Sequence, residues 1–325
     1  MTLPIIDISD LASPDPRIRQ QVGKALRTAC LDSGFFYCTG HGVPRELMQH
    51  VMRQTKDFFD QPMSTKMAIE KSQSDCNRGY EVLGGQTLQQ GGQPDQKEGF
   101  YMGVELPKSD PRVIAKRFNR GPNLWPENMP KFQSVLSDYF EKMTELGANL
   151  MRGIALSLTL PEDHFSAYDV DTLATLRLLH YPPQTPDKPE QQGAGAHTDF
   201  GGLTILLQDD CGGLQVWDRD HETWLDALPL SGAFVVNLGD MIARWTNDQY
   251  QSTLHRVINT SGRERYSVPF FYVGNPDFKV TCIESCLAEN DTPRYAPITV
   301  EEHLMSMYRK TYGEPEKGDK TTPKR

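Results

Sequence analysis

Apolar residues in the first half of the chain recur at the spacing of amphipathic helices. The segment 15–34 repeats apolar residues every three or four positions, which predicts a helix. The segments 44–62 and 129–158 show the same repeat and predict two further helices. Short apolar runs at 3–11 and 35–40 predict strands beside the first helix.

The pattern changes near residue 174, where short strand-like runs replace the helical repeat. Gly, Pro, Asp and Asn separate these runs, which include 243–246, and Asp240 just before it is predicted to lie in a turn. Many short strands at fairly regular spacing favour a sandwich or barrel over βαβ units. We therefore predict a β-rich catalytic core over 174–285.

The remaining segments are predicted to join this core without a linker. Residues 1–120 form the N-terminal, largely helical segment, and 297–311 form a C-terminal helix. The polar tail 314–325 is expected to be mobile. Residues 1–325 are therefore predicted to be a single fused domain.

Composition and charge argue against several kinds of partner. The 325 residues are 38% hydrophobic, enough for a substantial core. The net charge of −9 repels phosphate backbones and predicts no nucleic-acid partner. No apolar run approaches the roughly 18 residues of a membrane span, and the N-terminus does not resemble a signal peptide. We predict no membrane association, and no protein partner is indicated.

The six cysteines are scattered and form no CxxC pair. This usage predicts reduced thiols and a cytoplasmic location. Cys282 and Cys286 are alternative metal ligands, but no second pair accompanies them.

The clearest chemical signal is GAHTDFGGLTILLQDD, residues 195–210. Residues two apart on a strand point the same way, so His197 and Asp199 can converge while Thr198 points away. An imidazole nitrogen and a carboxylate oxygen suit Fe(II), Zn(II) or Mn(II). The alternative is a solvated strand end without a metal.

A third candidate ligand is His255, which apolar residues flank in a β-run. Two histidines and one carboxylate leave three positions open on an octahedral ion, as in the facial triad of non-haem Fe(II) oxygenases. A zinc hydrolase with the same ligands is the alternative.

Arg265 and Ser267 are again two residues apart in an apolar run. A guanidinium binds a carboxylate through two parallel hydrogen bonds, and a hydroxyl adds one more donor. An arginine that faces inward is costly without an anionic partner. That partner is either a carboxylate of the protein or a small dicarboxylate bound to the metal.

Together these motifs resemble the Fe(II)- and 2-oxoglutarate-dependent dioxygenases of the isopenicillin N synthase type. The resemblance spans nearly the whole chain and rests on LPIIDISDL, SGFFYCTGHGVP, LRLLHYPPQ, GAHTDFGGLTILLQDDCGGLQV, STLHRV and RYSVPFFYVGNPD. It implies a mixed α and β fold with a double-stranded β-helix (jelly roll) core, flanked by N-terminal and C-terminal helices.

The resemblance also implies roles for individual residues. Fe(II) would be held by His197, Asp199 and His255. 2-Oxoglutarate would be bound by Arg265, Ser267 and Tyr181. One departure is Leu179, where many members have an asparagine, so a cosubstrate contact is lost or supplied elsewhere. Arg177 is close enough in sequence to compensate if it faces inward.

Candidates for substrate contact are Arg78, Tyr80 and Arg177. The first two lie in CNRGY, which resembles a segment that reaches the substrate in isopenicillin N synthase; otherwise they are ordinary loop residues. The Gly- and Gln-rich stretch Gly84–Gly99 is expected to make few apolar contacts and, with the C-terminal tail, to flank the mouth of the barrel.

The implied activity is oxidation of a small molecule by O2, coupled to decarboxylation of 2-oxoglutarate at Fe(II). Hydroxylation, desaturation and cyclisation are all compatible with it. The alternatives are a 2-oxoglutarate-independent oxidase like isopenicillin N synthase, an ethylene-forming type of enzyme, and a metal-binding sensor without turnover. The sequence does not identify the substrate.

Overall fold

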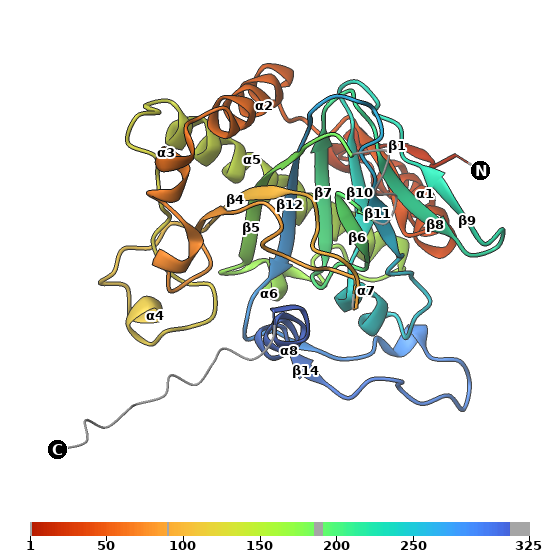
Figure 1. Ribbon diagram of the computed structural model, residues 1–325. Coiled ribbons are helices and arrows are strands. Elements are labelled where there is room, and N and C mark those ends of the chain that lie inside the picture. Colours follow the sequence, from red (N-terminus) through yellow and green to blue (C-terminus); the bar gives the residue numbers. More distant parts are fainter. Residues whose placement is uncertain (1, 90, 185–190, 313–325) are drawn as a thin grey trace.

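The computed structural model describes residues 2–89, 91–184 and 191–312 (Figure 1). The predicted tail 314–325 lies outside the described residues. The strands are β1 (Ile5–Asp7), β2 (Phe35–Thr39), β3 (Gly79–Glu81), β4 (Glu98–Gly103), β5 (Leu173–Tyr181), β6 (Ala194–His197), β7 (Leu203–Gln208), β8 (Leu214–Asp218), β9 (Thr223–Asp226), β10 (Phe234–Leu238), β11 (His255–Val257), β12 (Arg265–Gly274), β13 (Lys279–Val280) and β14 (Ile298–Thr299).

Helices precede, flank and follow the strands. The α-helices are α1 (Pro16–Asp32), α2 (Arg45–Phe59), α3 (Met63–Met67), α4 (Pro111–Ile114), α5 (Phe132–Ser157), α6 (Ser166–Asp169), α7 (Asp240–Trp245) and α8 (Val300–Tyr312). Three short 3₁₀ turns are η1 (Ser9–Ala12), η2 (Lys71–Gln73) and η3 (Glu284–Cys286). The predicted helices over 15–34, 44–62, 129–158 and 297–311 are confirmed as α1, α2, α5 and α8.

Two sheets form the centre of the protein. In the described part of the chain, the larger sheet has the order β1-β2-β10-β7-β12-β5-β4-β3, and the smaller has the order β6-β11-β8-β9. Strand β2 pairs in parallel with β1 and antiparallel with β10, so the N-terminal segment 1–120 and the segment 174–285 share one sheet. The predicted mixed α and β jelly roll is confirmed.

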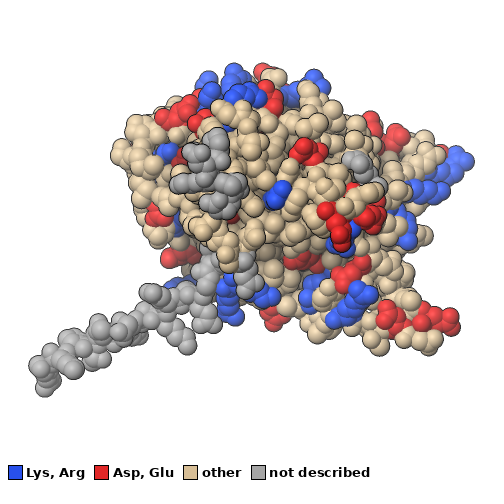
Figure 2. Space-filling model, turned by 45° about the vertical axis from the view of Figure 1, so that its right-hand side comes forward, with Lys and Arg blue, Asp and Glu red and all other residues tan. Residues whose placement is uncertain are grey.

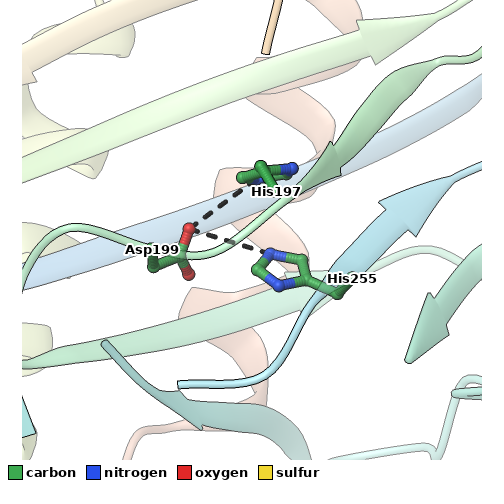
Figure 3. A group of neighbouring side chains, drawn as sticks. All are labelled: His197, Asp199 and His255. Atoms are coloured by element: carbon green, nitrogen blue, oxygen red, sulfur yellow. Dashed lines mark ion pairs between the residues drawn. The ribbon is translucent and has the colours of Figure 1, made fainter. Parts of the chain in front are cut away.

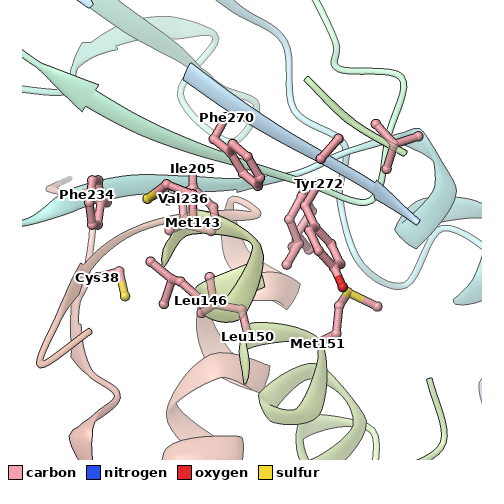
Figure 4. Close-up of a cluster of buried hydrophobic side chains, with 14 of the residues drawn as sticks. Cys38, Met143, Leu146, Leu150, Met151, Ile205, Phe234, Val236, Phe270 and Tyr272 are labelled. Atoms are coloured by element: carbon pink, nitrogen blue, oxygen red, sulfur yellow. The ribbon is translucent and has the colours of Figure 1, made fainter. Parts of the chain in front are cut away.

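Hydrophobic clusters cover both faces of the larger sheet. One cluster packs that sheet against the N-terminal helices and α5, whose Met143, Leu146 and Leu150 face the strands (Figure 4). Gly147 brings α5 close, because a Cβ there would lie 2.4 Å from a ring carbon of Tyr272. The second cluster fills the space between the two sheets and includes Leu179, Tyr181, Ala194, Leu206, Leu214, Val216, Val235 and Val257. This inner space is where the candidate site lies.

The prediction of a strand at 243–246 is wrong, and so is the assignment of Asp240 to a turn. Asp240 begins helix α7, where a carboxylate in the first turn interacts favourably with the helix dipole. Met241, Ile242 and Trp245 have the spacing of one helix face and are buried. A four-residue run is too short to separate the two periodicities.

The tryptophans take part in packing, and the cysteines are reduced, as predicted. Trp245 is buried in the core, and Trp217 packs against Trp224 with ring centroids 5.1 Å apart. All six cysteines are free thiols. Among the described residues, no helix has both the length and the apolar character needed to cross a membrane. On the face drawn in Figure 2, acidic and basic side chains are interspersed around a broad uncharged area.

We predict that Asp169→Asn stabilises the fold at neutral pH. Burial raises the pKa of Asp169 to about 6, although Tyr272 donates a 2.6 Å hydrogen bond to it. Since the folded pKa exceeds that of the unfolded chain, stability is highest at low pH and is lost as the pH rises through about 6. Each pKa unit is worth about 1.4 kcal/mol, and partial exposure reduces that figure, so we expect a gain of about 1–2 kcal/mol.

Urea unfolding at pH 7.5 and pH 4.5 measures this effect. The gain should be clear at pH 7.5 and much smaller at pH 4.5, and the exposed control Asp163→Asn should change little at either pH. An equal gain at both pH values would contradict the titration of Asp169.

Candidate metal centre and adjoining cavity

The smaller sheet brings His197, Asp199 and His255 together. Strand β6 ends at His197 and β11 begins at His255, and the two histidines are direct partners in the antiparallel pair β6–β11. Asp199 follows two residues after the end of β6. Its Oδ1 lies 3.7 Å from Nε2 of His197 and 3.7 Å from Nε2 of His255 (Figure 3). The predicted convergence of these three side chains is therefore present.

Hydrogen bonds fix both imidazole rings in the tautomer that a metal requires. Nδ1 of His197 lies 2.7 Å from the carbonyl of Gly195, and Nδ1 of His255 lies 3.1 Å from the carbonyl of Thr253. A carbonyl only accepts, so Nδ1 carries the proton in each ring. Each Nε2 then directs its lone pair toward Asp199, as outer partners orient the histidine ligands of metal sites.

The two oxygens of the Asp199 carboxylate have different partners. Oδ2 accepts hydrogen bonds from the Thr204 hydroxyl at 2.5 Å and from the Asn237 amide at 2.8 Å. Oδ1 is left to face the two imidazoles. Three protein ligands on one side, with these donors, fit a divalent ion such as Fe(II).

The electrostatics of the site also favour the protonation states in which His197 and Asp199 bind a metal. Burial and the neighbouring His255 lower the pKa of His197 to about 3, so its ring is neutral at physiological pH. Burial opposes ionisation of Asp199, but the two imidazoles and its hydrogen bonds outweigh burial and lower its pKa. A neutral imidazole and an ionised carboxylate are the forms that bind metal.

Sequence analysis missed Thr204 and Asn237. Asn237 is the one polar residue of β10, and Thr204 is a buried polar residue in the otherwise apolar inner part of β7. Such a residue needs a polar partner, and that requirement is the signal that could have identified both.

We expect Asn237→Ala to weaken Fe(II) affinity by about 10–100-fold, because outer-shell partners of metal ligands have effects of that size. Metal titration of the purified variant measures the loss. Gln215→Ala, on the outer side of β8 where its amide bonds Asp226, is the control and should bind Fe(II) like wild type. Equal affinities for all three proteins would remove Asn237 from the site.

A second metal-capable group among the described residues is Asp209, Asp210 and Cys211 at the surface, and Cys282 and Cys286 belong to neither group. The alternative of a metal site at Cys282 and Cys286 therefore gains no support.

Arg265 is fully buried and has unused hydrogen-bonding capacity. Its Nε donates to the carbonyl of Gly212 at 2.5 Å and Nη2 donates to Gln208 at 3.3 Å, whereas Nη1 has no partner in the described part of the chain. No carboxylate among the described residues forms an ion pair with it, which argues against a protein carboxylate as its partner. An orphaned, buried guanidinium nitrogen fits an anionic ligand.

Tyr181 and Ser267 lie beside this arginine. Tyr181 is opposite Arg265 in the β5–β12 pair, and the guanidinium carbon lies 4.7 Å from the tyrosine ring centroid. Burial raises the pKa of Tyr181, while Arg265 and Ser267 act in the opposite direction, which places both near its hydroxyl. Leu179 faces the same inner space and donates no side-chain hydrogen bond there.

A cavity opens over His197 and Asp199 and contains Arg177. The guanidinium carbon of Arg177 lies 4.6 Å from the ring centroid of Tyr101 and 4.8 Å from that of Phe271. The apolar and aromatic lining consists of Leu88, Leu173, Phe200, Phe271, Val273, Leu304 and Tyr308. The polar lining beside the ligands consists of Gln86, Asn119, Thr175, Arg177 and Thr198.

Arg78 and Tyr80 do not line this cavity. Tyr80 is buried in the helix-facing core and hydrogen-bonds Glu98 at 2.5 Å. Arg78 is buried behind the cavity wall and donates to the carbonyl of Asn119 at 2.8 Å. These positions do not support direct substrate contact, and local sequence resemblance carried no information on the direction of either side chain.

The stretch Gly84–Gly99 adjoins the cavity through Gln86 and Leu88. In line with the expected few apolar contacts, Leu88 is the hydrophobic residue of its described part that packs against a core cluster, although its polar residues Gln86, Asp95 and Lys97 are buried. From the opposite side, α8 contributes Leu304 and Tyr308 to the cavity. The predicted contribution of the C-terminal tail concerns residues outside the described part.

Comparisons with known proteins agree with this geometry. Residues 173–274 match the 2OG-Fe(II) oxygenase superfamily, and residues 3–128 match the N-terminal family of the non-haem dioxygenase in morphine synthesis. The 2-oxoglutarate-Fe(II) type oxidoreductase hxnY of Emericella nidulans is 44% identical over 96% of this chain and 91% of its own. The 2-oxoglutarate-dependent dioxygenase caaD of Aspergillus niger is 37% identical, with coverage of 98% and 97%.

A similar solved structure is that of a full-length Neurospora crassa protein in complex with alpha-KG and thymine. It superimposes with a TM-score of 0.81 at 29% identity, covering 94% of this chain and 97% of that chain.

Proposed function

Since the chain belongs to the 2OG-Fe(II) oxygenase superfamily, we propose that His197, Asp199 and His255 hold its iron and that Arg265 anchors its 2-oxoglutarate. The observation that carries this assignment is the convergence of two Nε2 atoms and one carboxylate oxygen, each oriented by a hydrogen bond on its far side. We also infer an isopenicillin N synthase-like subtype, which the match of the N-terminal segment 3–128 supports.

The protein is an oxidoreductase that oxidises a small molecule with Fe(II), 2-oxoglutarate and O2. When bound, the iron and cosubstrate supply O2-dependent oxidation coupled to conversion of 2-oxoglutarate to succinate. The protein's own residues bind and orient. Arg265, with Ser267 and Tyr181, would fix the distal carboxylate of the cosubstrate in a buried site from which bulk water is excluded.

For the primary substrate, we propose a small planar molecule that bears a carbonyl or carboxylate oxygen. Arg177 offers a guanidinium to such an oxygen, and Phe271 and Phe200 offer apolar surface to a flat ring. Tyr101 and Phe271 hold Arg177 on both sides, so little freedom is lost on binding. Thymine, named with the Neurospora crassa structure, is a planar carbonyl-bearing molecule of this kind.

A panel of planar carbonyl and carboxylate compounds tests this proposal. Fe(II)-loaded protein would be given labelled 2-oxoglutarate, O2 and one compound at a time, and succinate would be measured. A substrate should raise succinate formation above the background without compound. Arg177→Met should raise the KM for that substrate and leave the affinity for 2-oxoglutarate unchanged.

Arg256→Met is the matched control, because Arg256 also stacks on an aromatic ring, that of Trp224, but on the outer side of β11. It should retain the wild-type KM. If Arg177→Met and Arg256→Met behave alike, or if no planar compound stimulates succinate formation, the proposed substrate class is wrong.

A further inference from the structure

Two buried charged residues near the candidate site have no role in the function proposed so far. Asp95 and Lys97 are only 1% and 4% exposed, and the ammonium group of Lys97 forms an ion pair with Asp95. Both lie immediately before strand β4. Burying an ion pair is costly unless the geometry and the remaining hydrogen bonds compensate, so its position needs an explanation.

The strand register places Lys97 on the inner side of the larger sheet. Glu98 is opposite His180 in the antiparallel β4–β5 pair. Lys97, one residue before Glu98, therefore lies at the level of Tyr181, one residue after His180. Glu98 and His180 hydrogen-bond each other at 2.7 Å on the helix-facing side. Because side chains alternate along a strand, Lys97 lies on the same side as Tyr181.

Asp95 connects this pair to the metal ligand His197. Its Oδ1 accepts a 2.9 Å hydrogen bond from the amide of Gly195, and the carbonyl of Gly195 accepts the hydrogen bond from Nδ1 of His197.

The ammonium group has hydrogen-bonding capacity to spare. It carries three donors, and Asp95 is its one side-chain or backbone acceptor in the described part of the chain. The neighbouring inner positions, Gly99 and Leu179, provide no acceptor side chain. Two buried cations with unused donors, Lys97 and Arg265, therefore flank the inner space next to Tyr181.

We propose that Lys97 is a further cosubstrate-binding residue, which donates to the keto-acid end of 2-oxoglutarate while Arg265 binds the distal carboxylate. Asp95 compensates the charge of the ammonium group before the cosubstrate arrives. This assignment rests on the proposed function. A dicarboxylate has an anionic group at each end, and two cations at separate positions match it.

Three variants separate cosubstrate binding from simple anchoring of the loop before β4. Lys97→Met removes the donor, Asp95→Asn removes the ion pair but keeps an oxygen for the Gly195 amide, and the double variant removes both charges. Affinity for 2-oxoglutarate would be measured by anaerobic calorimetry with Fe(II) present, and thermal unfolding would confirm folding. Fe(II) affinity would be measured separately.

Lys97→Met and the double variant should bind 2-oxoglutarate about tenfold more weakly or worse. Asp95→Asn should retain wild-type affinity or bind more tightly, and Fe(II) affinity should stay within about threefold of wild type in all of them. If Asp95→Asn loses as much 2-oxoglutarate affinity as Lys97→Met, or if Lys97→Met loses none, the proposal is overturned.

A monocarboxylate analogue assigns the end of the cosubstrate that Lys97 binds. 2-Oxopentanoate has the keto acid but lacks the distal carboxylate, so Lys97→Met should weaken it by the same factor as 2-oxoglutarate, whereas Arg265→Ala should not. Unchanged 2-oxopentanoate binding in Lys97→Met would overturn the assignment of the end. If wild type binds no 2-oxoglutarate, the proposed function itself fails; binding that depends on Arg265 but not on Lys97 refutes this inference alone.

Discussion

Replacing His197, Asp199 or His255 by alanine should abolish Fe(II) binding or weaken it by more than about 100-fold. Each substitution removes one of the three protein ligands, whereas loss of a partner behind a ligand already costs about 10–100-fold. The two histidines lie opposite each other across β6–β11, so no neighbouring side chain of that pair replaces a lost imidazole. Anaerobic Fe(II) titration of each variant measures the effect.

His221→Ala is the matched control for these variants. His221 is an exposed histidine that hydrogen-bonds Asp218 in the β8–β9 turn, outside the metal-ligand group. It should bind Fe(II) like wild type. Near wild-type affinity in any one of the three ligand variants would remove that residue from the metal centre.

The second large effect is expected at Arg265. Arg265→Ala should lose about 2–5 kcal/mol of 2-oxoglutarate affinity, because charge-assisted hydrogen bonds are lost and an anion is left buried without its partner. Fe(II) binding should survive, since the guanidinium touches neither imidazole nor Asp199 within hydrogen-bond distance. Equilibrium dialysis of labelled 2-oxoglutarate against the Fe(II)-loaded variant gives the affinity.

Ser267→Ala provides an internal comparison on the same strand. It removes one neutral donor, so its loss should be about 1 kcal/mol and clearly smaller than that of Arg265→Ala. If Arg265→Ala binds 2-oxoglutarate as tightly as wild type, the arginine has another partner and the cosubstrate site lies elsewhere.

The sequence was most informative where the local geometry of a strand decides the direction of a side chain. Alternation along a strand was sufficient to predict that His197 and Asp199 converge, and that Arg265 and Ser267 face one side. Strand pairing could not be predicted from the local sequence. That β2 lies between β1 and β10, and that His255 lies opposite His197, depends on contacts between distant segments.

Other features escaped prediction for physical reasons. The helix at Asp240 looked like a strand because four residues do not establish a period. Thr204 and Asn237 lie in apolar strands, and their hydrogen bonds to Asp199 form only because folding brings that carboxylate next to them. Arg78 and Tyr80 resembled substrate-contacting residues in sequence, yet Arg78 is buried behind the cavity wall and Tyr80 is buried in the helix-facing core.

The anaerobic absorption spectrum of the wild-type protein with Fe(II) and 2-oxoglutarate tests the central claim most directly. We predict a visible charge-transfer band that requires both components, disappears in Asp199→Ala and needs much more 2-oxoglutarate in Arg265→Ala. Absence of the band in wild type at millimolar 2-oxoglutarate, with Fe(II) bound, would contradict chelation of the cosubstrate at this triad and favour an oxidase that does not use 2-oxoglutarate.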